Sequence, residues 1–158
     1  MYEPKNYDHL IGTPGFSDQL LKNHFTLYQG YVKNVNLIME KLAAVREGKL
    51  ELDPYIVAEL RRRFAFEFDG MRMHELYFAQ MEAGSRKLEA GSALANAVKE
   101  KYGEKGLEAH IKEVARTRGI GWGVVYKDTI AGTLHTTFVA DHEVGQLAGL
   151  PIVFALDL

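Results

Sequence analysis

Two of the six histidines, His24 and His74, occupy positions where their side chains could act together. Each falls on the apolar stripe of a long helical segment, residues 18–45 for the first and 54–81 for the second, where apolar residues recur at three- and four-residue steps. Inward imidazoles from two facing helices can bind one metal ion. The alternative is a hydrogen-bonded pair of core histidines, or a histidine paired with Glu67.

Asp157 favours the metal interpretation. It closes an apolar strand candidate at residues 152–157, where an unpaired carboxylate must either be exposed at the strand end or bind a cation. The chain has no cysteine, which excludes disulfides, thiolate metal sites and thiol catalysis. Two imidazoles and one carboxylate form a nitrogen and oxygen donor set that suits iron or manganese.

Other residues could assist such a site or simply pack. Tyr31 follows His24 by seven residues and therefore lies on the same helix face. Trp122 is the only tryptophan; it stands between glycines at a strand start, where it could be a large core residue. His142 comes just after the second strand and by itself indicates a surface loop histidine. The arginines at 61–63 indicate a solvated helix face that could add positive potential near a site.

Periodicity and capping signals predict the elements that position these residues. Ser17 precedes the first long helix as an N-cap, and Asp53-Pro54 opens the second. A short polar connection joins them into an antiparallel hairpin. The expected buried stripe of the first helix consists of Leu20, Leu21, His24, Leu27, Tyr28, Tyr31, Val35 and Ile38. Two shorter helices are expected at residues 92–102 and 105–118. Strands are expected at residues 121–126, 133–139 and 152–157, with a hairpin turn at residues 128–132.

The predicted fold class is α+β: an N-terminal antiparallel helical hairpin followed by a small α/β domain with a three-stranded antiparallel sheet. The glycine- and serine-containing segment 83–92 indicates a linker. We therefore expect residues 1–84 to form an N-terminal arm and helical hairpin. Residues 85–158 are expected to form a C-terminal α/β domain that is incomplete at its end.

Composition narrows the class of protein further. The chain has 158 residues, of which 47% are hydrophobic and 25% charged, and a net charge of -2. These values are ordinary for a globular domain, and no basic excess points to nucleic acid or an anionic membrane. The longest apolar run is too short to span a bilayer, and the N-terminus lacks an apolar leader. We expect a soluble, cytoplasmic protein with neither nucleic-acid nor membrane partners.

Four segments, in this order and spacing, resemble the iron/manganese superoxide dismutase family over residues 9–158. Residues 24–36 look like the first-ligand helix of that family. Residues 70–78 look like its second-ligand segment, where a histidine precedes an aromatic pair. Gly-Ile-Gly-Trp at 119–122 is similar to the G-S-G-W entry to its sheet, and residues 151–157 are similar to the strand that leads into D-x-W-E-H-A.

The resemblance implies a role for each candidate residue. His24, His74 and Asp157 would be the metal ligands. Tyr31 would be the gateway tyrosine of the substrate channel, and Trp122 would pack beside the metal. His142 falls where most members place a glutamine that hydrogen-bonds the metal-bound solvent, so the chain resembles the subgroup with histidine there.

The chain departs from the family pattern in the first helix. Most members space the ligand histidine and the gateway tyrosine eight residues apart, and here the spacing is seven. A gapless comparison would put Asn23 at the ligand position; because asparagine is a poor ligand for this metal, we assign His24 and infer a one-residue difference such as a missing bulge. Tyr28 takes the place of the outer gateway histidine.

The resemblance implies superoxide dismutase activity: conversion of superoxide to oxygen and hydrogen peroxide, with one iron or manganese ion per chain. At full length it implies a homodimer or tetramer. The family's fourth ligand, a histidine in the W-E-H-A segment, would fall beyond Leu158. A continuously apolar strand, such as the one that precedes this segment, is normally covered by other elements on both faces. We therefore expect a missing or partner-supplied segment, and weak or absent activity from the 158-residue chain. The alternatives are a truncated, inactive or partner-completed non-enzymatic derivative of this fold, or an oxygenase-type iron site.

Overall fold

The computed structural model describes residues 1–82, 84 and 87–158. The chain divides into two compact units, Met1–Glu82 and Ala83–Leu158. The linker and the boundary expected between residues 84 and 85 involve residues 83, 85 and 86, which lie outside the described residues. Both units contain the predicted kinds of element, so the α+β class is confirmed.

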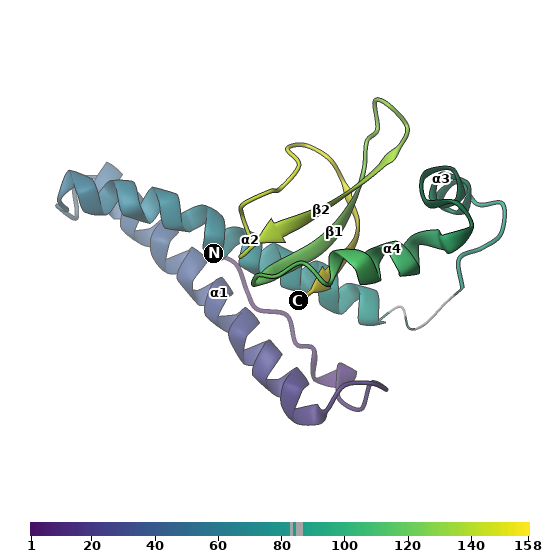
Figure 1. The fold of residues 1–158 in the computed structure, drawn as a ribbon. Coiled ribbons are helices and arrows are strands. Elements are labelled where there is room, and N and C mark those ends of the chain that lie inside the picture. The colour runs from purple at the N-terminus through teal and green to yellow at the C-terminus, as the bar shows by residue number, and fades with distance from the viewer. Residues whose placement is uncertain (83, 85–86) are drawn as a thin grey trace. The chain divides into compact units, whose positions relative to one another are not determined.

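The first unit is an antiparallel pair of long helices, α1 (Asp18–Arg46) and α2 (Pro54–Glu82), preceded by the 3-10 turn η1 (Asp8–Leu10) (Figure 1). The predicted start signals are in place. The Ser17 hydroxyl accepts a hydrogen bond from the Leu20 N–H (3.2 Å), and Asp53 Oδ1 accepts one from the Tyr55 N–H (2.8 Å). These bonds satisfy N–H groups that have no partner within the helix.

The buried face of α1 includes much of the expected stripe, but two of the expected leucines lie outside it. Its buried residues are Leu21, Phe25, Tyr28, Val32, Val35 and Ile38. Leu20 and Leu27, which were expected to be buried, are 50% and 49% exposed, so that prediction is wrong. Each immediately precedes a buried residue, and successive residues of a helix point about 100° apart. The apolar character of Leu20 and Leu27 was therefore not enough to predict that their side chains face the core.

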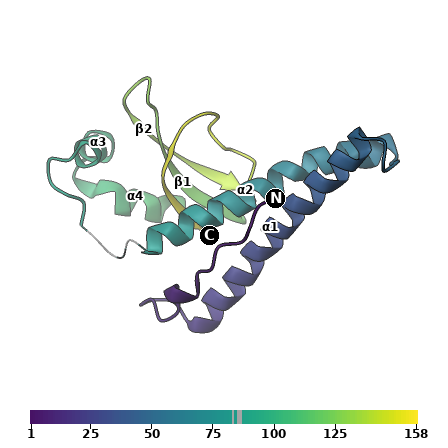
Figure 2. The same cartoon turned by 180° about the vertical axis from the view of Figure 1, so that it is seen from behind.

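The N-terminal arm is fastened to the hairpin (Figure 2). The Tyr2 N–H donates to Asn36 Oδ1 (2.8 Å), and Asn36 Nδ2 donates back to the Tyr2 carbonyl (2.7 Å). Further along, the Tyr7 ring packs against Phe78, with 4.6 Å between ring centroids. The arm thus helps to bury the aromatic end of the hairpin core, where both candidate histidines lie.

Two buried phenols, Tyr7 in this arm and Tyr28 in α1, predict an alkaline loss of stability. Burial raises the pKa of Tyr28 to about 12, and burial raises the pKa of Tyr7 as well. The Tyr28 hydroxyl also donates to Glu75 Oε1 (3.0 Å). The folded chain keeps protons that the unfolded chain loses above about pH 10. The contribution of Tyr28 is therefore complete below about pH 10 and is lost between about pH 10 and 12, at up to about 1.4 kcal/mol per pH unit.

Urea unfolding at several alkaline pH values measures this slope. Tyr28→Phe should flatten it relative to the parent chain, because phenylalanine has no proton to lose. An equal slope in the variant and the parent would contradict the prediction.

Glu67 is buried in α2 and was considered as a histidine partner. Its hydrogen-bond donors are different residues: Arg63 Nε donates to one carboxylate oxygen (2.7 Å), and Asn34 Nδ2 donates to the other (3.2 Å). The Arg63 guanidinium also lies 3.7 Å from the centroid of the Phe66 ring. All three arginines at 61–63 are exposed, as expected of a solvated helix face. Each oxygen of the buried Glu67 carboxylate therefore accepts a hydrogen bond without a histidine partner.

The second unit begins with two short helices, α3 (Ala93–Tyr102) and α4 (Gly106–Val114), joined by the 3-10 turn η2 (Gly103–Lys105). The helix expected to run to Arg118 ends at Val114, so that boundary is wrong. Beyond it the Arg116 N–H donates to the Glu113 carbonyl and the Thr117 N–H to the Val114 carbonyl. These bonds to the third preceding residue tighten the helix end.

The sheet of the second unit has strands β1 (Gly121–Lys127), β2 (Leu134–Ala140) and β3 (Ile152–Asp157). Both pairings are antiparallel, as predicted, and the strand order is β2-β1-β3. Figure 2 shows β1 and β2 with α3 and α4 of the same unit. The core of the unit is built on Val98, Ile111, Val125 and Leu134. Within the described part of the chain, no helix is both long and apolar enough to cross a membrane.

Candidate metal centre

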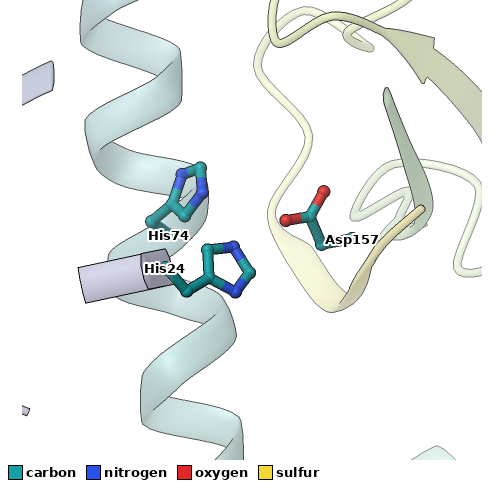
Figure 3. Close-up of side chains that lie close together, drawn as sticks. All are labelled: His24, His74 and Asp157. Atoms are coloured by element: carbon teal, nitrogen blue, oxygen red, sulfur yellow. The ribbon is translucent and has the colours of Figure 1, made fainter. Parts of the chain in front are cut away.

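The two helices of the first unit bring His24 and His74 together (Figure 3). Their rings lie 4.9 Å apart between centroids and nearly perpendicular, and one ring nitrogen of each lies within 4.8 Å of the other. Asn23, the other candidate in α1, is exposed, and its side-chain oxygen accepts from Gln19 Nε2 (2.8 Å). It is therefore His24, not Asn23, that α1 directs toward His74.

A backbone contact fixes the protonation of His74. Its Nδ1 lies 2.6 Å from the Gly70 carbonyl oxygen, one helical turn earlier. A carbonyl can only accept, so Nδ1 must carry the proton. In the neutral ring Nε2 then holds the lone pair, which is the form in which imidazole binds a metal. His74 is buried, so this state is shielded from bulk water.

Aromatic rings surround the histidine pair within the first unit. His24 packs against Tyr77 (5.5 Å between centroids) and Phe78 (5.3 Å), and Tyr31 packs against His74 (5.2 Å). An apolar wall limits solvent access and lowers the local dielectric around polar ligands. Tyr31 therefore lies where the shared helix face predicted it, in contact with a candidate ligand.

Asp157 and Trp122 lie in the second unit, on adjacent strands. They are paired residues of β3 and β1, so their side chains share one face of the sheet. Trp122 is fully buried and Asp157 is partly buried. The Asp157 carboxylate, drawn in Figure 3, accepts a hydrogen bond from the Leu158 N–H (3.1 Å) at Oδ1. The strand end thus presents a carboxylate next to a large indole.

His142 is not on the surface, as its loop position by itself indicated: it is 8% exposed. The Trp122 indole Nε1 donates to His142 Nδ1 (2.9 Å). An indole N–H can only donate, so Nδ1 accepts and the neutral ring carries its proton on Nε2. Trp122 and His142 therefore form one hydrogen-bonded pair, with the Nε2–H of His142 as a donor.

Two residues of this second group were not found from the sequence. The Tyr126 hydroxyl donates to the Gln146 side-chain oxygen, and Gln146 Nε2 donates to the His142 carbonyl oxygen (3.0 Å). Tyr126 has an ordinary place in a strand, and Gln146 lies in an irregular loop. No periodicity marks either residue, because loop side chains meet according to the turn geometry.

The donor set and fold indicate a mononuclear metal protein, and comparison with known proteins identifies its relatives. No family model matches the chain. It is 31% identical to the iron superoxide dismutase of Aquifex pyrophilus, over 98% of this chain and 74% of that protein. It is 31% identical to a manganese superoxide dismutase of Haloferax volcanii, over 99% of the chain and 77% of that protein. It is 28% identical to the iron superoxide dismutase of Saccharolobus solfataricus, over 91% and 70%.

At this identity and coverage, the chain belongs to the iron/manganese superoxide dismutase family. The resemblance carried by its four sequence segments is confirmed. The relatives named for iron and those named for manganese match almost the same share of the chain, so the comparison supports both metals.

Proposed function

We propose that this protein is a superoxide dismutase with one iron or manganese ion per chain, held by His24, His74 and Asp157. The observation that carries the proposal is the imidazole pair of α1 and α2, in which the Gly70 carbonyl sets the Nδ1–H tautomer of His74. Asp157 would supply the anionic oxygen ligand that two neutral imidazoles lack. Nitrogen and carboxylate donors without thiolate suit both metals. The non-enzymatic alternative is not favoured, since the relatives described above are named as enzymes.

The reaction converts two superoxide anions and two protons into one oxygen and one hydrogen peroxide. When bound, the metal supplies the one-electron oxidation and the one-electron reduction. The chain must supply donors for an anionic substrate and protons for the peroxide. Tyr31, whose ring contacts His74, and His142, which carries an Nε2–H, are the groups we assign to these tasks. Trp122 sets the tautomer of His142 and therefore which atom can donate.

Metal loading tests the function directly. The purified chain would be loaded separately with iron and with manganese, and superoxide decay would be followed per bound metal. We expect a weak excess of superoxide decay over the same concentration of free metal, in keeping with the weak activity that the sequence predicts, and loss of this excess when a chelator strips the metal. Stoichiometric metal with no excess decay would refute the proposed function for both metals.

The assignment of Asp157 has its own test. Asp157→Asn should weaken manganese retention by about 10- to 100-fold, because a neutral amide replaces the anionic ligand. Asp18→Asn is the matched control, since Asp18 is an exposed residue in the first turn of α1. Metal content after dialysis, measured by mass spectrometry, should fall for Asp157→Asn alone. Equal retention in both variants would remove Asp157 from the ligand set.

The family resemblance also supports a homodimer or a tetramer as the assembly of the full-length protein. Light scattering coupled to size-exclusion chromatography gives the mass in solution. A monomer at micromolar concentration would contradict this part of the proposal.

A further inference from the structure

The turn that carries His142 is fixed at several points. The Ala140 N–H donates to the Val144 carbonyl (2.8 Å), and the Val144 N–H donates back to the Ala140 carbonyl (3.2 Å). Asp141 has φ 52°, an uncommon conformation for a residue with a side chain. Gly145 has φ 104°, and a Cβ there would lie 2.8 Å from the Phe138 carbonyl oxygen. A turn held by this many constraints keeps the backbone of His142 in one conformation, which is typical of residues at functional sites.

Gln146 connects this turn to the central strand. Its amide donates to the His142 carbonyl oxygen (3.0 Å), and its carbonyl accepts from the Tyr126 hydroxyl. The His142 ring is held separately, by the Trp122 indole (2.9 Å). Trp122 and Tyr126 are four residues apart on β1, so they lie on the same face of the strand. His142 is therefore attached to β1 twice, once through its ring and once through its backbone.

The two attachments depend on each other. The indole bond forms only when His142 Nδ1 is unprotonated and faces Trp122. The other tautomer would place two N–H donors against each other and leave the buried indole N–H unsatisfied. The Gln146 bond fixes the backbone from which the ring extends. If the backbone shifts, the ring loses the alignment that the indole bond requires.

We propose that Gln146 and Tyr126 are positioning residues for His142: together they hold its ring against Trp122 and so keep its proton on Nε2. Neither residue has been assigned a part in the reaction above. This inference rests on the proposed role of His142 for its effect on turnover. The hydrogen bonds themselves can be measured independently of any activity.

The single tryptophan makes the test specific, because the chain has only one indole N–H. We would compare the parent chain with Gln146→Met and Tyr126→Phe, and use Gln29→Met, at an exposed position on α1, as the matched control. Nitrogen-15 NMR of the full chain without added metal reports the Trp122 N–H resonance and its exchange with solvent. The same spectra report the tautomer of the His142 ring.

In both variants we expect Trp122 N–H exchange to accelerate by about 5- to 10-fold, as for loss of one hydrogen bond. We also expect the His142 ring to show a mixture of tautomers, where the parent shows Nε2–H alone. Gln29→Met should match the parent. Tyr126→Phe keeps the strand residue's shape, so it remains informative if Gln146→Met fails to fold.

Unchanged indole exchange and an unchanged His142 tautomer in a folded Tyr126→Phe or Gln146→Met variant would overturn the inference. After metal loading, we expect both variants to retain the parent's metal content and to lose turnover by about 5- to 10-fold, in proportion to the lost His142 alignment. If the parent itself shows no dismutation, the proposed function fails, while the NMR result still decides the positioning role.

Discussion

His74→Ala is expected to remove stably bound metal from the protein, lowering its affinity for manganese by more than about 100-fold. His74 is the better anchored member of the histidine pair. It is buried, and the Gly70 carbonyl fixes its tautomer, so its Nε2 is the nitrogen that we propose as a ligand. Alanine removes this imidazole, and the carboxylate of the next residue, Glu75, is held by Arg72 and Tyr28. Metal content per chain after dialysis, measured by mass spectrometry, gives the result.

The control for this variant is His9→Ala, since His9 is an exposed histidine paired with Glu82 (2.7 Å) at the edge of the same unit. It should retain metal like the parent. The thermal melt of each metal-free variant separates loss of metal from loss of fold, because His74→Ala also opens a cavity. A folded His74→Ala chain with parental metal content would exclude the histidine pair as the metal centre.

Gly121→Ala is expected to prevent the second unit from folding, at a cost above about 4 kcal/mol in the free energy of unfolding. A Cβ at Gly121 would lie 2.1 Å from the Val139 carbonyl oxygen, which is a backbone atom of the neighbouring strand. The added methyl group can be accommodated only if β1 and β2 move apart next to Trp122. Urea unfolding followed by circular dichroism should show loss of cooperative strand signal.

Gly30→Ala provides a control with the opposite sign. Gly30 lies within α1, and a Cβ there meets nothing within 4 Å. Alanine in a helix is favoured over glycine by about 0.5–1 kcal/mol, so this variant should be slightly more stable than the parent. If Gly121→Ala unfolded within about 1 kcal/mol of the parent, the close approach of the two strands would be wrong.

His74→Ala and Gly121→Ala both test how the main chain positions buried polar side chains. Gly70 supplies a carbonyl that orients His74, and Gly121 permits the strand contact that places Trp122. Gly70 lies one helical turn before His74, and Gly121 lies directly before Trp122. Main-chain geometry thus supports the candidate ligand His74 and the neighbouring Trp122, and substitutions elsewhere on the surface should leave this support intact.

The amino-acid sequence by itself determined most of the elements and the set of candidate residues. The long helices began at Ser17 and Asp53 as their capping signals predicted, and β3 covers residues 152–157 as expected. These features follow from contacts between residues close in the chain, which local residue types encode. The candidate histidine and carboxylate ligands were likewise selected from residue chemistry and from the resemblance to a known family.

Tertiary structure decided which faces were buried and which polar atoms met. Leu20 and Leu27 have the right residue type for a core, yet the packing of α1 against α2 leaves them half exposed. His142 looks like a surface residue until the turn after β2 folds its ring against Trp122, and Gln146 gains a role only through that turn. The Trp122–His142 and Tyr126–Gln146 contacts each join residues 20 positions apart. Their geometry depends on strand register and turn conformation, which no local pattern specifies.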